Sequence, residues 1–396
     1  MRSILIFLYA LSSVHSFFLV KLKNLDTKTF TPKISDRSGL FATSSTNDDD
    51  GTSPRRSFFK QALTGALLTG IVGNKIAIEG PTPYTPPMGL LDGKVIVITG
   101  GNTGLGLETA KRLVAGGATV ILTSRNSAKG AKAVQAVEDY EPSSKGKVFS
   151  LSLDLCDLAD VKAFPNKYRD LLGERKIDVL VNNAGVMAVP ELETSKDGFE
   201  KTFATNHLGH FALTALLFPS LNKGGRIVNV SSMAHLIVAD GLDMDNLNAE
   251  KGYKPWDAYG RSKLENVLFT KELQNRIDKA GLGLTAVTLH PGAVRTDLAR
   301  YLVGEDTYVP MDEQKDAKLS LDPKTLALLP LVYFTKAVDR GATSQVWLSS
   351  FQGSDVGGKF FQNCKEVKLG PAACDLDKAK QLWDVSSKLS GVDFNI

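Results

Sequence analysis

The chain has 396 residues, a formal net charge of +4 and 43% hydrophobic residues. This length exceeds one average domain but suits an α/β domain with a leader in front of it. The small net charge gives no support for a nucleic-acid partner, and three cysteines without ligand spacing indicate neither a disulfide scaffold nor a zinc site.

The first residues predict a targeting leader. Residues 1–16 combine a basic start, an apolar stretch over 4–11 and a small residue at the end, which is typical of a secretory signal peptide. A short buried helix is the alternative. Residues 17–53 are basic and rich in Ser and Thr, so we expect them to be disordered. Together the two segments resemble the bipartite presequence of algae whose plastids have additional membranes.

Residues 54–80 predict a second targeting signal. The sequence PRRSFFK resembles the twin-arginine signal, from which it departs at Pro54 and Phe59. The uncharged run 61–74 is too short to span a bilayer. The three signals in order predict a plastid protein, with the thylakoid lumen and the stroma both open. An interfacial anchor that contacts a membrane surface is the alternative, as is a chance arginine pair.

Residues 81–89 are rich in Pro and Gly and predict a linker to one domain over residues 90–396. In this domain, short apolar runs alternate with helical patterns, which predicts a Rossmann-type, doubly wound parallel α/β sheet. The expected strands are 95–99, 119–123, 148–153, 178–182, 226–230 and 284–289. The expected helices include 105–115, 128–140 and 260–277.

The first strand leads into a glycine-rich turn, TGGNTGLGLETA, at residues 99–110. Gly100, Gly104 and Gly106 lack a Cβ, so the main chain can approach a pyrophosphate closely. The free N–H groups and the dipole of the following helix favour the same anion. This context predicts a dinucleotide site, where a glycine pattern alone would be weak evidence.

Further motifs follow in a fixed order. They are NNAG (182–185), NHLGHF with Asn206, IVNVSS ending at Ser232, YGRSK with Tyr259 and Lys263, and HPGAVRT (290–296). With the glycine turn, they make residues 90–396 resemble the short-chain dehydrogenases/reductases. The stretches YGRSKLENVLFTKEL and RIVNVSSMAH look like the retinol-dehydrogenase-like branch of that family.

Tyr259 and Lys263 are four residues apart on a predicted helix, so we expect their side chains to lie on the same face. A cation near the phenol would lower its pKa from about 10 toward neutral pH. The resemblance implies that Tyr259 is the acid/base, that Lys263 also holds the nicotinamide ribose and that Ser232 binds the substrate carbonyl. It implies that Asn206 positions a water that relays protons to Lys263.

The cofactor is expected to be NADP(H). The second strand ends without the acid that binds a ribose 2′-hydroxyl in NAD sites, and Arg125 stands just beyond it, suited to a 2′-phosphate. An arginine pointing to solvent is the alternative. The resemblance implies these further cofactor contacts: Gly100, Asn102, Thr103, Gly104, Leu105, Gly106, Asp154, Leu155, Asn182, Ala184, Gly185, Tyr259, Lys263, Pro291, Gly292 and Thr296.

Other residues allow competing interpretations. We expect His207 and His210 to be packing residues, because no third metal ligand lies near them in the sequence. A disulfide between Cys364 and Cys374 stays open. Segment 299–335 is where this family places a substrate lid, and its apolar residues favour a lipophilic substrate or simply pack the lid.

The resulting hypothesis is an enzyme that interconverts an alcohol and a carbonyl on a small lipophilic substrate by Tyr/Lys acid–base catalysis and hydride transfer. A protochlorophyllide-reductase-like enzyme is one alternative, although no cysteine lies near Tyr259 in the sequence. An NADPH-binding sensor without turnover is the other. The sequence leaves the substrate, the direction of reaction and the oligomeric state open.

Overall fold

The computed structural model describes residues 80–299, 335–353 and 355–396, which all belong to one compact unit. The leader through residue 79 and residues 300–334, which are nearly all of the predicted lid over 299–335, lie outside the described residues. The signal peptide, the transit-like segment, the twin-arginine-like signal and the plastid localisation therefore stay predictions. Within the described residues, no helix is both long and apolar enough to cross a membrane.

The elements alternate between strand and helix along the chain. The strands are β1 (Val95–Ile98), β2 (Thr119–Ser124), β3 (Lys147–Ser152), β4 (Ile177–Asn182), β5 (Leu221–Val230), β6 (Thr285–His290), β7 (Phe360–Gln362) and β8 (Lys365–Glu366). The α-helices are α3 (Gly104–Ala115), α4 (Ser127–Glu138), α5 (Leu158–Leu172), α6 (Lys201–Phe203), α7 (Gly209–Leu217), α8 (Pro255–Lys279), α11 (Val338–Ser349) and α12 (Leu376–Ser390). The π-helix η1 (Ala204–Leu208) joins α6 to α7, and the 3-10 helices η3 (Met233–Val238) and η5 (Asp297–Ala299) follow β5 and β6.

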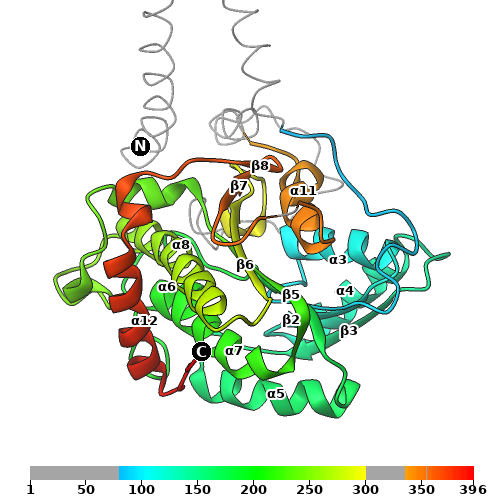
Figure 1. Cartoon of the computed structure of the whole chain (residues 1–396), viewed down its shortest axis with the longest axis horizontal. Coiled ribbons are helices and arrows are strands. Elements are labelled where there is room, and N and C mark those ends of the chain that lie inside the picture. The colour runs from blue at the N-terminus through cyan, green and yellow to red at the C-terminus, as the bar shows by residue number, and fades with distance from the viewer. Residues whose placement is uncertain (1–79, 300–334, 354) are drawn as a thin grey trace, which may run out of the picture. The chain divides into compact units, whose positions relative to one another are not determined.

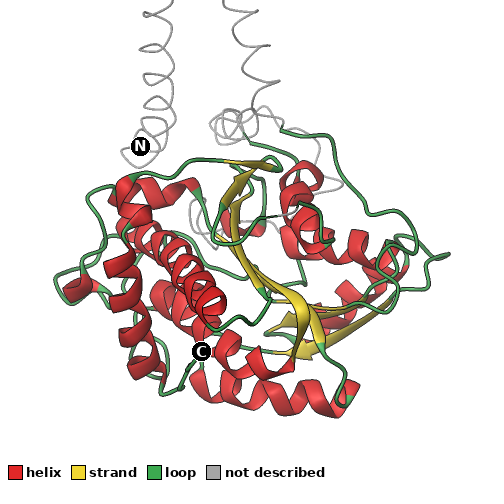
Figure 2. Ribbon diagram, in the orientation of Figure 1, coloured by secondary structure: helices red, strands yellow, loops and turns green. Residues whose placement is uncertain are grey.

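The strands form one sheet in the order β3-β2-β1-β4-β5-β6-β7-β8. Neighbours from β3 to β7 are parallel, and β8 is antiparallel to β7. Figures 1 and 2 show the twisted sheet between two layers of helices, with α3, α4 and α11 on one side and α5, α7, α8 and α12 on the other. The predicted doubly wound parallel fold is confirmed, and the strand order reverses direction between β1 and β4.

The central strands are apolar on both faces because both faces are covered. In β1, Val95 and Val97 join the core under α5, α7 and α8, whereas Ile96 and Ile98 join the core under α3 and α11. All four are at most 2% exposed. Alternate residues of a strand point to opposite faces, so this continuous apolar run serves two cores at once.

The strands β7 and β8 were absent from the sequence-based prediction, because three and two residues carry no readable pattern. The expected helix over 260–277 begins earlier, at Pro255, whose fixed φ suits the first turn of a helix. This earlier start places Tyr259 inside α8 and confirms that Tyr259 and Lys263 share one helix.

Residues 80–93, which include the predicted linker, contain neither a helix nor a strand but lie against α3. Arg112 of α3 is 2% exposed and donates to the main-chain carbonyls of Tyr84 (3.2 Å) and Asp339 (2.8 Å). Its guanidinium is also paired with Glu108 at 2.6 Å. One buried arginine thus ties this segment and the start of α11 to the first helix of the fold.

The C-terminus closes the opposite layer through an aromatic cluster. Phe394 is 3% exposed and stacks on Trp383 of α12 at 4.6 Å between ring centroids. It also meets Phe211 of α7 edge-on at 5.6 Å and Phe218 at 5.2 Å. These rings hold α12 against α7 and α8, which carry the candidate site.

We expect Phe394→Ala to lower the free energy of unfolding by about 3–5 kcal/mol, because it removes a buried ring from a packed cluster. Urea denaturation of the two proteins measures the difference. Leu376→Ala is the control, since Leu376 is 55% exposed and its loss should cost less than about 0.5 kcal/mol. Equal losses in the two variants would contradict the role of the cluster.

Candidate active site

The carboxyl ends of β1, β4 and β5 bring the predicted site residues together. The register pairs Ile98 of β1 with Val181 of β4, and Asn182 of β4 with Asn229 of β5. The segments that follow these strands therefore start side by side at one edge of the sheet. This edge, at the point where the strand order reverses, is where ligands bind in open α/β sheets.

The glycine turn after β1 has no room for side chains. Gly100 has φ +63°, a conformation that L side chains rarely adopt. A Cβ on Gly106 would lie 2.5 Å from the Gly100 carbonyl oxygen and 2.7 Å from Nδ2 of Asn183. The first glycine permits the turn and the last lets α3 pack directly on it, as the sequence pattern predicted.

The N-terminus of α3 offers free main-chain donors. Thr103 is its N-cap residue, but its side chain makes no capping bond. The Thr103 hydroxyl instead donates to Asp297. Gly104 opens the helix, and a Cβ there would lie 3.3 Å from Thr296. The first N–H groups of α3 thus stay available to an anion, with the 296–297 segment beside them.

The predicted 2′-phosphate residue follows β2. Arg125 is exposed, comes directly after Ser124 and has no acid next to it in the chain. Its charge acts to lower the pKa of the Cys156 thiol, although burial raises that pKa overall. Asp154 accepts from the Cys156 N–H at 3.0 Å, and Leu155 is buried. The charges of Arg125 and Asp154 both act on the Cys156 thiol, so the segments after β2 and β3 lie close together.

The residues of the NNAG segment after β4 contact different parts of the site. Gly185 lies beside Asn206 and Lys263. A Cβ there would lie 3.1 Å from Oδ1 of Asn206 and 3.6 Å from Nζ of Lys263. Ala184 packs against Gly100, where a Cβ would lie only 3.0 Å from the Ala184 Cα. The Asn182 side chain turns into the core, so any cofactor contact it makes comes from its main chain. The amide of Asn182 donates to Thr214 (3.0 Å) and Asn229 (2.7 Å).

Asn206 lies in the π-helix η1, a kind of irregular turn often found at functional sites. Its side-chain oxygen accepts from the Val186 N–H at 2.8 Å. Its amide donates to the Val186 carbonyl and to the Ser262 hydroxyl, both at 2.9 Å. The side chain is thus committed to bracing the chain after Gly185, so the relay to Lys263 that the resemblance implies would have to use the Asn206 main chain.

Tyr259, Lys263 and Ser232 lie together, as predicted. Tyr259 and Lys263 are each 4% exposed on α8, and Lys263 Nζ is 5.7 Å from the centre of the Tyr259 ring. Lys263 Nζ also donates to the Val230 carbonyl at 3.1 Å. The Ser232 side chain is near enough to the Tyr259 phenol to lower its pKa. Acid, cation and polar hydroxyl thus meet at the end of β5.

The expected lowering of the Tyr259 pKa does not occur in this structure. Burial raises the pKa of Tyr259 to about 12, and the Ser232 side chain, which acts to lower it, offsets only part of that rise. Burial also lowers the pKa of Lys263 to about 8. The physical reason is that desolvation disfavours both charged forms. At neutral pH, Tyr259 is therefore a protonated phenol beside an ammonium, the form suited to giving a proton.

Lys336, which the sequence analysis did not identify, holds the segment after β6 in place. Gly292 has φ +91°, and its N–H donates to Nδ1 of His290 at 2.9 Å. Lys336, 5% exposed, donates to the Pro291 carbonyl at 3.1 Å and to the Asn363 side chain at 2.7 Å. A lone lysine far along the chain carries no sequence signal for this contact.

Two further residues were also missed. Asn183 Nδ2 donates to the carbonyls of Thr99 (2.8 Å) and Gly100 (3.3 Å), which braces the glycine turn. The Thr99 hydroxyl accepts from the N–H groups of Asn183 (2.9 Å) and Ala184 (3.0 Å). Both residues stand inside the quoted motifs, so their positions in TGG and NNAG were the available signal.

The histidines and cysteines resemble no metal centre. His207 and His210 are buried and hydrogen-bonded, to Ser386 and to Thr99 respectively. Among the described residues, no group of three or more His, Cys, Asp or Glu side chains is placed to hold a metal ion. The three cysteines are free thiols, so the open disulfide between Cys364 and Cys374 is not formed.

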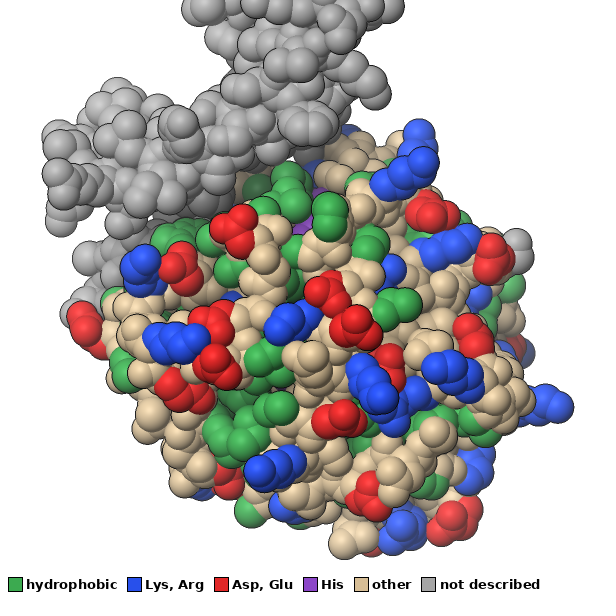
Figure 3. Space-filling view, turned by 60° about the vertical axis from the view of Figure 1, so that its left-hand side comes forward, with side chains coloured by type: hydrophobic (Ala, Val, Ile, Leu, Met, Phe, Trp, Pro, Cys, Tyr) green, Lys and Arg blue, Asp and Glu red, His purple; other side chains and the backbone are tan. Residues whose placement is uncertain are grey.

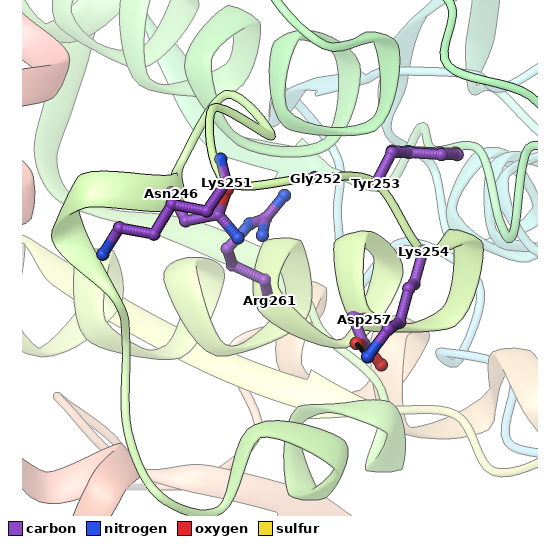
Figure 4. Close-up of a pocket in the computed structure, with 7 residues that line it drawn as sticks. All are labelled: Asn246, Lys251, Gly252, Tyr253, Lys254, Asp257 and Arg261. Carbon is purple, nitrogen blue, oxygen red and sulfur yellow. Dashed lines mark hydrogen bonds and ion pairs between the residues drawn. The ribbon is translucent and has the colours of Figure 1, made fainter.

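A polar pocket of about 220 Å³ lies outside the chemistry. Figure 4 shows it between residues 246–254 and the first turns of α8, with Lys254 beside Asp257. These two side chains are 3.5 Å apart. Asp257 and Arg261 are each two residues from Tyr259, so they point away from the Tyr259 face. Figure 3 shows acidic and basic side chains mixed over one face of the molecule, without a broad region of one sign.

Comparison with known proteins agrees with this geometry. The short chain dehydrogenase family model matches residues 94–306. Human retinol dehydrogenase 14 is 38% identical over 317 residues, which is 77% of this chain and 88% of that protein. Mouse retinol dehydrogenase 12 is 37% identical over 309 residues, again 77% of this chain and 88% of that protein.

Solved structures share the fold. A protein from Mycobacterium paratuberculosis has a TM-score of 0.60 and 34% identity, and the match covers 80% of this chain and all of that one. An angucycline C-6 ketoreductase with bound NADP has a TM-score of 0.52 at 22% identity, covering 71% and 97%. This chain therefore belongs to the short-chain dehydrogenase/reductase family of oxidoreductases, as the family match, the similar proteins, the order of the motifs and the parallel sheet together show.

Proposed function

We propose that this chain is an NADP(H)-dependent enzyme that interconverts an alcohol and a carbonyl on a small lipophilic substrate. The observation that carries the proposal is the meeting of the buried Tyr259 and Lys263 with the half-buried Ser232 at the end of β5. A protonated phenol and an ammonium 5.7 Å from the centre of its ring are costly to bury together. Chemistry at this point explains that cost.

The residues present fit a nicotinamide dinucleotide. The glycine turn lets a pyrophosphate approach the main chain, and the N-terminus of α3 supplies donors and a favourable dipole. Gly185 leaves open the space that a Cβ would occupy beside Asn206 and Lys263. Arg125, exposed after β2 with no acid beside it in the chain, suits a ribose 2′-phosphate. When bound, NADPH supplies the hydride.

In the reducing direction, this chain's residues handle the proton. The Tyr259 phenol gives its proton to the substrate oxygen as negative charge develops there. The Ser232 hydroxyl, which lowers the pKa of the phenol, donates to the same region. The Lys263 ammonium stabilises the phenolate that forms, because opposite charges attract strongly in a buried site. Oxidation of an alcohol uses the same groups in reverse.

A lipophilic substrate fits the surface next to Ser232. The 3-10 helix η3 begins at Met233, and Met233, Leu236 and Ile237 are 38%, 51% and 43% exposed. Exposed apolar side chains beside a catalytic hydroxyl favour an apolar ligand over a polar one. The names of the retinol dehydrogenases similar to this chain indicate a lipophilic alcohol as well.

We expect Tyr259→Phe to lower kcat for carbonyl reduction about 100-fold to 10,000-fold, because it removes the proton donor and keeps the ring. The measurement is NADPH oxidation with a panel of lipophilic aldehydes and ketones. The affinity for NADPH, followed by its fluorescence, should change by about tenfold or less, since at most one hydrogen bond to the cofactor is lost. A variant that keeps full turnover would contradict the mechanism, and tight NADPH binding by a wild type that reduces nothing would favour the sensor alternative.

We expect kcat/KM for reduction to decline as the pH rises through about 8, since Lys263 loses its charge above its lowered pKa. Below that pH the ammonium is present and the rate should be flat. Lys263→Arg keeps the charge and should move the decline to higher pH. Burial lowers the pKa of Lys336 to about 8 too, so Lys336→Arg is the control. A decline that moves only in Lys336→Arg would show that Lys263 is not responsible.

We expect Arg125→Ala to raise the Kd for NADPH about tenfold or more and to leave the Kd for NADH unchanged, because only NADPH carries the 2′-phosphate. Fluorescence titration of both cofactors measures the ratio. Lys129→Ala is the control, since Lys129 is an exposed cation one turn further on, in α4. Parallel loss of both affinities in Arg125→Ala would contradict the assignment.

A further inference from the structure

His210 lies at the start of α7, behind the Tyr259–Lys263 pair, and the mechanism above does not use it. Its side chain is 2% exposed. Nδ1 lies 3.0 Å from the main-chain carbonyl oxygen of Asn206, and Nε2 lies 2.8 Å from the Thr99 hydroxyl. One imidazole therefore bridges the π-helix that holds Asn206 and the residue that begins the glycine turn.

The protonation of His210 follows from its partners. Burial lowers its pKa to about 4, and the charge of Lys263 acts in the same direction, so the ring is neutral at neutral pH. A neutral imidazole has one N–H and one acceptor. The Asn206 carbonyl can only accept, so Nδ1 carries the hydrogen. Nε2 then accepts the hydrogen of the Thr99 hydroxyl.

The Thr99 end of this bridge supports cofactor binding. The Thr99 oxygen accepts from the N–H groups of Asn183 and Ala184, so its own hydrogen is left to donate. Nε2 of His210 is nearer to it, at 2.8 Å, than the Val181 carbonyl at 3.3 Å. The bond to His210 thus orients the hydroxyl that joins the two turns expected to hold the dinucleotide.

The Asn206 end supports the chemistry. Asn206 braces Val186 and donates to the Ser262 hydroxyl at 2.9 Å, and that hydroxyl donates to the Tyr259 carbonyl at 2.8 Å. Gly185 lies next to both groups, since a Cβ there would be 3.1 Å from Oδ1 of Asn206 and 3.6 Å from Nζ of Lys263. A shift of the Asn206 main chain would therefore be transmitted to the acid and to the cation.

We propose that His210 is a positioning residue whose two ring nitrogens separately hold the cofactor turn, through Thr99, and the catalytic helix, through Asn206. This inference rests on the proposed function. Both bonds are buried, and breaking either one would leave a ring nitrogen of His210 without its partner, so each half should have its own measurable effect. Lys263 and His207 are the titratable groups that interact with His210 by charge.

Two isosteric variants separate the halves. The amide nitrogen of Asn can occupy the place of Nδ1. His210→Asn therefore keeps the hydrogen bond to the Asn206 carbonyl and loses the hydrogen bond from the Thr99 hydroxyl. The amide oxygen of Gln can reach the place of Nε2 and accept from the Thr99 hydroxyl. His210→Gln therefore keeps the hydrogen bond from Thr99 and loses the hydrogen bond to the Asn206 carbonyl. We expect His210→Asn to raise the Kd for NADPH about tenfold and to keep kcat within about twofold.

We expect the opposite from His210→Gln: a kcat about tenfold lower, a shifted midpoint in the pH profile of kcat, and a Kd for NADPH within about twofold of the wild type. The measurements are NADPH fluorescence titration, saturation kinetics across pH and the melting temperature, all on the purified full-length chain. Kinetics are taken at saturating NADPH, so the two effects do not mix.

His207 provides the matched control. It is three residues away, 1% exposed, and bonded to the Ser386 hydroxyl at 2.8 Å on the side of α12. His207→Asn and His207→Gln should lower the melting temperature and leave the Kd and the pH profile unchanged. If the two His210 variants behave like these controls, or if they affect both quantities equally, the proposal is overturned.

The proposed function fails separately. A wild type that binds NADPH but reduces no carbonyl in the panel would remove the reaction. The NADPH titrations of His210→Asn and His210→Gln need no substrate. They still test whether the hydrogen bond between Thr99 and His210 supports cofactor binding. An unchanged Kd in His210→Asn would overturn the proposal in that case, and a selective rise would support it.

Discussion

The parallel alignment of β1, β4 and β5 is the constraint on which the site depends. These strands end at one edge because their register pairs Ile98 with Val181 and Asn182 with Asn229. The glycine turn, the Gly185 segment and Ser232 each leave from one of these ends. Parallel strands require helices on both faces, so the same arrangement that builds the two cores also delivers the polar residues to a common edge.

Behind this edge, a buried polar network replaces the apolar packing found elsewhere in the layers. Thr99, Asn183, Asn206, His210 and Ser262 bond one another or nearby main-chain groups within the core. Buried polar groups are tolerated when they are paired, and a paired network fixes positions more sharply than apolar contacts. The network therefore gives the site a rigid support, which a reaction that depends on the placement of a proton donor requires.

Burial also decides the chemistry of the acid. A lysine next to a tyrosine suggested a lowered phenol pKa, but both groups are 4% exposed, and desolvation moves each toward its neutral form. The result favours a phenol that holds its proton until the substrate oxygen needs it. In the proposed reaction, the ammonium would contribute mainly when the phenolate has formed, because it stabilises the negative charge at that point.

The sequence by itself determined the doubly wound sheet, the family, and the grouping of Ser232, Tyr259 and Lys263. Strand runs such as VIVI and the ordered motifs are local signals, and a parallel sheet converts their order into proximity. Only the tertiary structure decided that Asn182 turns into the core, that Lys336 holds Pro291, that His210 joins Thr99 to Asn206 and that burial raises the pKa of Tyr259. These four depend on contacts between residues far apart in the chain and on the exclusion of water, and neither is written in the spacing of residues.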